Sequence, residues 1–198
     1  MVVPVKHLSL AKSRLASYGD DRRQALALAF AADVVLAALE VAQVLVVTDD
    51  EVAAPVLAAL GARVVRDDPD AGLNPALIHG AELLRIDHPD LGVATLSADL
   101  PALRPEDLAS ALALVPIGGR GFVADVAGTG TTLLAAGRGA VLLPAYGPGS
   151  RAGHLASGAV ELSAAPGLRR DVDTPEDLEA AAALGLGAHT ALAVRGLW

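Results

Sequence analysis

The chain has 198 residues, a length that favours a single domain spanning residues 1–198. It contains no cysteine, which excludes disulfides and thiolate metal sites, and it lacks the run of about 18 apolar residues that a membrane span requires. With 53% hydrophobic residues, these features predict a soluble, cytoplasmic protein, while the net charge of −8 argues against binding to nucleic acid, whose phosphates an acidic protein repels.

Positive charge gathers in the first segment of the chain. Residues 1–23 carry five basic side chains and two aspartates, a net charge of +3. Since the whole chain has a net charge of −8, the remaining residues carry −11. A compact cationic segment on an acidic protein is suited to one small anion. We therefore expect small-molecule partners, and neither nucleic acid nor a membrane.

Short apolar runs alternate with helix-like stretches in the first half of the chain, which is the pattern of an α/β fold. We expect strands at residues 2–5, 44–47, 62–65 and 93–96, and helices at residues 21–39, 51–60 and 74–86. The valine-rich run at 44–47 lacks polar alternation, as is typical of a buried parallel strand. These elements predict a mixed sheet in one domain.

Glycine and proline are more frequent in the second half. Pro-Glu-Asp-Leu occurs at residues 105–108 and 175–178. We interpret both copies as helix starts rather than as a duplicated domain, because proline and acidic residues are favoured in a first turn. Thr174 and Asp177 have the spacing of a capping box. Strands are expected after residue 115, ending with residues 160–162 and with a strand that enters Asp171.

Three aspartates are candidate metal ligands. Asp99 follows the strand at 93–96, at the edge where ligands bind in open α/β sheets. Asp171 and Asp173 would point to one face of an extended segment, where like charges repel unless a cation lies between them. Hard carboxylate oxygens suit Mg²⁺, whereas the five histidines are too dispersed for a zinc site.

Each of these carboxylates also has a simpler interpretation. Asp99 can be an ordinary turn residue before Leu-Pro. Asp173 can merely lead into the helix that starts at Thr174, with Asp171 paired to Arg169 or Arg170.

Two glycine-rich loops, at residues 128–132 and 146–151, could cradle an anion with their backbone N–H groups. Ser150 is also placed to begin a helix, so that its hydroxyl and the helix N-terminus would point the same way. Neither loop matches a Walker A or a G-x-G-x-x-G motif, and each alone is more typical of a turn. Lys6, Lys12 and Arg14 follow the first strand; they are either a phosphate-binding loop or a solvated charged loop.

Taken together and in order, six segments resemble one family. They are residues 4–15 (Pro-Val-Lys through Ala-Lys-Ser-Arg-Leu), 72–77 (Gly-Leu-Asn-Pro-Ala-Leu), 97–101 (Ser-Ala-Asp-Leu-Pro), 128–132 (Gly-Thr-Gly-Thr-Thr), 147–150 (Gly-Pro-Gly-Ser) and 171–174 (Asp-Val-Asp-Thr). The chain is similar, from about residue 2 to residue 185, to the guanylyltransferases of coenzyme F420 biosynthesis, which act on phosphoenolpyruvate or 2-phospho-L-lactate.

The resemblance implies an α/β, three-layer, Rossmann-like nucleotidyltransferase (nucleotide-diphospho-sugar transferase) fold with a mixed, mostly parallel sheet. It implies GTP as substrate and Mg²⁺ as cofactor. The implied roles are metal binding and catalysis for Asp99, Asp171 and Asp173, catalysis and nucleotide binding for Lys12, nucleotide binding for Lys6, Arg14 and Asn74, and acceptor binding for Thr132, Gly147 and Ser150.

One departure from the family pattern indicates the acceptor. Phospholactate enzymes tend to have Pro-Asp before the Gly-Thr-Gly loop and Asn after it, whereas this chain has Ala124-Asp125 and Thr132. The resemblance therefore favours transfer of GMP from GTP to the phosphate of phosphoenolpyruvate.

Other functions remain open at this point. The acceptor could be 2-phospho-L-lactate, 3-phosphoglycerate or, as in molybdenum-cofactor enzymes, a pterin. The chain could also be a glycosyltransferase that uses Asp-x-Asp and a metal. A non-catalytic regulatory subunit that binds a nucleotide is the third alternative. A homodimer is also open, because the apolar tail at residues 191–198 could cover an interface.

Overall fold

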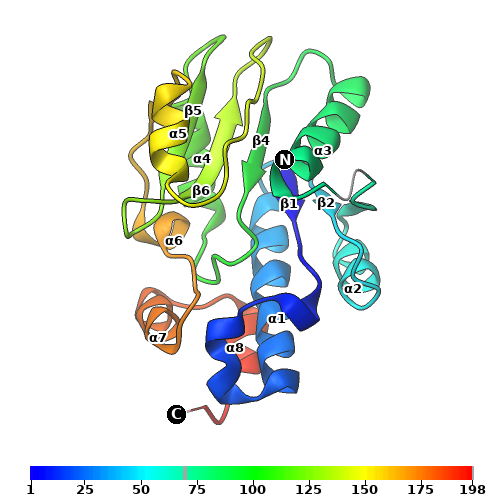
Figure 1. Ribbon diagram of the computed structural model, residues 1–198, viewed down its shortest axis with the longest axis vertical. Coiled ribbons are helices and arrows are strands. Elements are labelled where there is room, and N and C mark those ends of the chain that lie inside the picture. Colours follow the sequence, from blue (N-terminus) through cyan, green and yellow to red (C-terminus); the bar gives the residue numbers. More distant parts are fainter. Residues whose placement is uncertain (69–70, 198) are drawn as a thin grey trace.

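A computed structural model of the chain describes residues 1–68 and 71–197. A seven-stranded sheet in the order β3-β2-β1-β4-β6-β5-β7 lies between two layers of helices (Figure 1). The strands are β1 (Val2–Pro4), β2 (Leu45–Val47), β3 (Arg63–Val65), β4 (Val93–Leu96), β5 (Arg120–Ala124), β6 (Thr131–Ala136) and β7 (Val160–Glu161). Only β6 runs antiparallel to its neighbours within these residues. The predicted mixed, mostly parallel sheet is confirmed.

Side chains alternate across the sheet and build two separate cores. Val3, Val46 and Leu133 point to one face, while Val2 and Phe122 point to the other. The first face packs against α1 (Asp20–Leu39), α2 (Ala53–Ala59), α4 (Pro105–Ala113) and α6 (Pro166–Arg169). The second packs against α3 (Leu73–Asp87), and α5 (Ser150–Ala156) adjoins Phe122 there through His154. The molecule is therefore a three-layer α/β/α sandwich.

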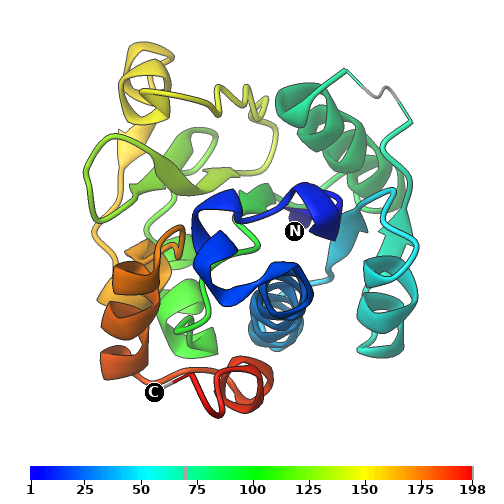
Figure 2. The same cartoon turned by 60° about the horizontal axis from the view of Figure 1, so that its bottom comes forward.

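A third core lies beyond the sheet, beside the N-terminal half of α1. Helices α7 (Pro175–Leu184) and α8 (Ala188–Ala193) pack there with Phe30, Leu15 and Val172. Figure 2 shows the N-terminal loop lying across this end of α1. The apolar tail contributes Val194 to the same core, so part of the surface expected at an interface is used within the chain. Trp198 lies outside the described residues.

Most predicted elements are confirmed to within two residues, and the capping box of Thr174 and Asp177 is present at the start of α7. The predicted strand entering Asp171 is wrong. Pro166 begins the short helix α6 instead, because its fixed φ and missing N–H suit a first helical turn. The sequence Asp-Asp-Pro-Asp-Ala-Gly at residues 67–72 predicts a turn, of which residues 69–70 lie outside the described part of the chain. Within that part, no helix has the length and apolar character needed to cross a membrane.

Candidate active site

The loops that carry the predicted site residues meet at one edge of the sheet. β1 and β4 end at this edge, and the antiparallel β6 begins there, as the bond from the Ser97 N–H to the Thr132 carbonyl oxygen shows (2.8 Å). The Val172 N–H donates to the carbonyl oxygen of Asp99 at 3.0 Å. This bond holds the Asp-Val-Asp segment beside Asp99, although 72 residues separate them along the chain.

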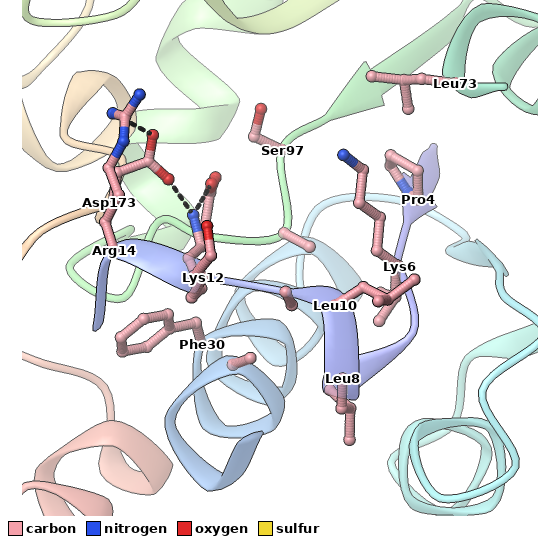
Figure 3. Close-up of a pocket in the computed structure, with 16 residues that line it drawn as sticks. Pro4, Lys6, Leu8, Leu10, Lys12, Arg14, Phe30, Leu73, Ser97 and Asp173 are labelled. Carbon is pink, nitrogen blue, oxygen red and sulfur yellow. Dashed lines mark hydrogen bonds and ion pairs between the residues drawn. The ribbon is translucent and has the colours of Figure 1, made fainter. Parts of the chain in front are cut away.

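Lys12 lies between two of the acids (Figure 3). Its Nζ is 2.5 Å from Asp99 Oδ2 and 2.8 Å from Asp173 Oδ1. Burial alone would lower the pKa of Lys12, but the two carboxylates outweigh it and raise this pKa, so the ammonium stays charged. The backbone of Lys12 is left-handed (φ 54°), between the 3₁₀ turns η1 (Leu8–Leu10) and η2 (Ser13–Tyr18).

Asp173 is held ionised by its neighbours. Burial would raise its pKa, but Lys12, then the Arg14 guanidinium at 3.6 Å, then Lys6 lower it overall. In this structure Lys12 and Arg14 therefore form ion pairs with the Asp173 carboxylate, whereas the resemblance implied that they bind the nucleotide.

Asp171 is in the opposite situation. Burial raises its pKa to about 6, with further contributions from the carboxylates of Asp99, Asp125 and Asp173. Among the described residues, neither of the neighbouring arginines, Arg169 and Arg170, forms an ion pair with Asp171. Arg169 donates to the carbonyl oxygens of Ala124 and Asp125, and Arg170 lies 3.8 Å from Asp177. The simpler interpretation of Asp171 as an arginine partner therefore finds no support.

The acids at this edge of the sheet offer oxygen ligands to a divalent cation. Among the described residues, no group of three or more His, Asp or Glu side chains is assembled closely enough to hold a metal ion, and Lys12 supplies the cation between Asp99 and Asp173. However, Asp99 Oδ1 is buried without a hydrogen-bond partner, and Asp171 is partly buried near the carboxylates of Asp99, Asp125 and Asp173. Mg²⁺ commonly takes one or two protein carboxylates together with substrate phosphates. The donor set fits such an ion, and the ligand assignment stays a prediction.

Two adjoining cavities open beside this group. The larger, about 420 Å³, is bordered by the loop after β1 and by the end of β4, with Lys6, Lys12, Arg14, Asp99 and Asp173 among its lining residues. The smaller, about 210 Å³, shares Lys6 with it and extends to Gly72 at the start of α3. The cationic loop therefore faces a cavity of the size of a nucleotide site, rather than open solvent.

Two buried charges that the sequence analysis missed hold this loop in place. Arg23, which we counted with the N-terminal positive charge, is buried in α1 and donates to the carbonyl oxygens of Leu8, Ser9 and Ala11. Asp50 accepts from the Leu8 N–H at 2.8 Å and from the first turns of α2. Arg23 stands in the polar stretch at residues 20–24, so the local sequence carried no signal of its burial.

The first glycine-rich loop is organised around the protein's own carboxylate. Asp125 accepts from the N–H groups of Thr129 and Gly130, both at 2.9 Å. A Cβ at residue 130 would lie 2.4 Å from Asp125 Oδ2, so a side chain there would displace this carboxylate. The N–H groups that we expected to face an anion are thus occupied by Asp125.

The predicted acceptor residues Thr132, Gly147 and Ser150 lie outside the lining of both cavities. Thr132 is buried and its hydroxyl donates to the Leu168 carbonyl oxygen at 2.7 Å. The Ser150 hydroxyl, at the predicted helix start, donates to Thr131 Oγ1 at 3.1 Å. Gly147 has a φ of 138°, a conformation that favours glycine. Ser150 and Thr131 thus form a buried hydroxyl cluster at the start of α5, whereas Thr132 bonds to Leu168 instead.

His154 completes this cluster. It is fully buried, its Nε2 accepts from the Ala145 N–H at 3.0 Å, and its Nδ1 therefore donates to Thr131 Oγ1 at 2.9 Å. Burial, followed by repulsion from Arg120, lowers the pKa of His154 to about 4. The imidazole is neutral at physiological pH, and this tautomer holds the 144–150 loop against α5.

The buried histidine predicts a specific pH dependence of stability. Histidine in the unfolded chain titrates near a pKa of ~6.5, so between pH ~6.5 and 4 the unfolded state binds more protons and stability falls as pH falls. We expect His154→Gln to flatten this part of the profile, measured as the free energy of urea unfolding at pH 7.5, 6.5, 5.5 and 4.5. His79→Gln, at a half-exposed site, is the matched control. Equal slopes for wild type and His154→Gln would contradict the assignment.

Asn74 lies at the start of α3, where its amide bonds to the backbone of Tyr146. It borders neither cavity directly, although the adjacent Leu73 lines both.

Comparison with known proteins identifies the family. The model of the family described as guanylyl transferase, CofC like, matches residues 1–195. The chain belongs to the CofC-like guanylyl transferase family. The CofC-like chain is 58% identical to the phosphoenolpyruvate guanylyltransferase of Thermomonospora curvata, covering 96% of this chain and 86% of that protein. It is 56% identical to the enzyme of that name from Streptomyces avermitilis, covering 100% and 94%. The family resemblance carried by the six segments is confirmed.

Solved structures share the fold of the CofC-like chain. A candidate nucleotide-diphospho-sugar transferase from Desulfovibrio desulfuricans superposes with a TM-score of 0.75 at 16% identity, over 96% of this chain and 91% of that one. CMP:2-keto-3-deoxy-manno-octonic acid synthetase superposes with a TM-score of 0.53 at 19% identity, over 92% and 96%. The predicted nucleotidyltransferase fold is confirmed, and the CofC-like family is one of nucleotidyltransferase enzymes.

Proposed function

We propose that this chain transfers GMP from GTP to the phosphate group of phosphoenolpyruvate. A phosphate oxygen of the acceptor attacks the α-phosphorus of GTP, the bond between this phosphorus and the oxygen bridging to the β-phosphorus breaks, and pyrophosphate leaves. The product is enolpyruvyl-diphospho-guanosine. The relatives named phosphoenolpyruvate guanylyltransferase, at 56–58% identity, support this acceptor, as do Ala124-Asp125 and Thr132.

The reaction needs little proton transfer. A phosphate monoester with a second pKa of about 6 is largely dianionic at neutral pH, so the nucleophile requires no general base. His154 is the buried histidine nearest the predicted acceptor loop, and both of its ring nitrogens are engaged by the protein. This arrangement is consistent with chemistry that uses charge and position instead of an imidazole base.

The observation that carries the proposal is the cationic cavity beside paired aspartates at the carboxyl edge of the sheet. Two unit charges ~4 Å apart repel by ~4 kcal/mol at an effective dielectric of ~20, and two phosphate compounds present several such pairs. Lys6, Lys12 and Arg14 line the cavity where this repulsion must be offset. Lys12 and Arg14 are also close enough to Asp173 to exchange a carboxylate partner for a phosphate.

Magnesium is part of this proposal. Asp99, Asp171 and Asp173 are the residues that would hold it, and the unpartnered Asp99 Oδ1 is the donor that needs no rearrangement. When bound, the ion would stabilise negative charge on the phosphates. Lys12 then orients the triphosphate, and the loops around Gly147 and Ser150 orient the acceptor.

The test is product formation by the purified protein. GTP, Mg²⁺ and phosphoenolpyruvate should release pyrophosphate and yield the guanylylated product by mass spectrometry. Parallel reactions contain 2-phospho-L-lactate or 3-phosphoglycerate as acceptor, and ATP, CTP or UTP as donor. Higher kcat/KM with another acceptor would replace phosphoenolpyruvate, and GTP binding without pyrophosphate release would indicate a regulatory subunit.

A further inference from the structure

The amide of Asn74 links the two halves of the candidate site. Its Oδ1 accepts from the Tyr146 N–H at 2.8 Å, and its Nδ2 donates to the Tyr146 carbonyl oxygen at 2.9 Å. Both polar atoms of the side-chain amide are therefore hydrogen-bonded to the backbone of a single residue, 72 positions away. Asn74 is also the one asparagine in the sequence.

Each end of this link leads to a different part of the site. On one side, Gly72 and Leu73 directly precede Asn74 and line the cavities beside the cationic loop. On the other side, Tyr146 directly precedes Gly147, in the loop that runs to Ser150. Since the glycines at 147 and 149 both have positive φ and give this loop little intrinsic stiffness, its position depends on what holds its first residues.

Other contacts fix Tyr146 and its neighbour at the same place. The Tyr146 hydroxyl bonds to Thr95 Oγ1 at 2.8 Å on β4, and the Ala145 N–H donates to His154 Nε2. The Tyr146 ring packs edge-on against His154 at 5.3 Å. Asn74 is the member of this group that comes from the nucleotide side of the sheet edge.

We propose that Asn74 is a positioning residue for the acceptor loop, and not a nucleotide ligand as the resemblance implied. It ties the α3 terminus beside the nucleotide cavity to the loop of Gly147 and Ser150, so that the acceptor is held at a fixed distance from the α-phosphorus. This inference rests on the proposed function. Its consequence is that removing the amide displaces the acceptor loop while the lining of the nucleotide cavity is kept.

The experiment separates the kinetic constants for the two substrates. Asn74→Ala should raise the KM for phosphoenolpyruvate by roughly tenfold or more, because two hydrogen bonds that fix the loop are lost. The KM for GTP, and the Kd of GTP measured by calorimetry without acceptor, should stay within about twofold of wild type. Glu82→Ala, at an exposed position on the same helix, is the matched control and should leave all three values unchanged.

An isosteric variant protects the test against misfolding. Asn74→Asp keeps the acceptor for the Tyr146 N–H but turns a carboxylate oxygen toward the Tyr146 carbonyl oxygen. Relative to wild type at each pH, its KM for phosphoenolpyruvate should be raised at pH 8 and should approach wild type near pH 5, where the carboxyl group is more often protonated and can donate. A purely structural defect would not recover in this way.

The outcomes distinguish the two proposals. An active wild type whose Asn74→Ala and Asn74→Asp variants lose GTP affinity, with the KM for phosphoenolpyruvate unchanged, overturns the positioning role alone. Unchanged constants for both substrates overturn it as well. A wild type that forms no product from phosphoenolpyruvate overturns the proposed function, and with it this inference.

Discussion

Replacing Asp173 with asparagine should lower kcat for GMP transfer by on the order of 10³-fold, which corresponds to a loss of about 4 kcal/mol of transition-state stabilisation. Asp173 is the carboxylate on which Lys12 and Arg14 converge, and it is also a predicted magnesium ligand. Asparagine preserves its shape but removes the charge that organises these cations. Lys12 keeps Asp99 as a partner, so we expect the fold to persist.

Steady-state kinetics and circular dichroism of the same preparations check this expectation. Glu176→Gln removes an exposed carboxylate from the first turn of α7, three residues away, and should change kcat less than twofold. A folded Asp173→Asn protein that retains more than about a tenth of wild-type kcat would remove Asp173 from the reacting centre.

Lys12→Met should reduce kcat/KM for GTP by on the order of 10²-fold. The ammonium is buried between Asp99 and Asp173 and lines the larger cavity, where it is the cation best placed to move onto a triphosphate. Methionine fills similar space without charge. Arg22→Met, which removes an exposed cation from the same N-terminal segment, is the control and should have little effect.

A second measurement on Lys12→Met does not depend on turnover. In wild type, Lys12 occupies one oxygen of each carboxylate, so an added divalent ion competes with it. A ligand that binds only the folded state stabilises it. In the absence of nucleotide, about 10 mM Mg²⁺, on the order of the Kd of a weak site, should therefore raise the Tm of the variant more than that of wild type. Equal shifts would mean that Lys12 and the ion use different positions.

Much of this protein was predictable from local sequence patterns. The strands, the helix starts at Pro105 and Pro175 and the capping box depend on neighbouring residues, so periodicity and turn chemistry suffice to predict them. The placement of Asp99 at the ligand edge also followed from its position after a buried strand. The strand predicted before Asp171 failed because Pro166 favours a helical turn that an apolar count does not detect.

Partners that are distant in the chain were not predictable in this way. Lys12 with Asp173, Asn74 with Tyr146 and Arg23 with the carbonyl oxygens of the cationic loop each bring together groups whose sequences carry no mark of one another. Asn74 was assigned to the nucleotide from its motif, and its hydrogen bonds became visible only when α3 and the 146–150 loop were folded against the same sheet edge.

The layered α/β architecture, the family and the set of charged residues at the candidate site could all be predicted from the amino-acid sequence, because they follow from periodicity and from short motifs in a fixed order. How those charges are paired, which loop N–H groups are occupied by the protein itself, and which side chains hold the 146–150 loop became known only from the folded chain. The physical reason is that hydrogen bonds and ion pairs act over about 3–4 Å, and the distances between residues far apart in the chain are set by packing of the whole domain.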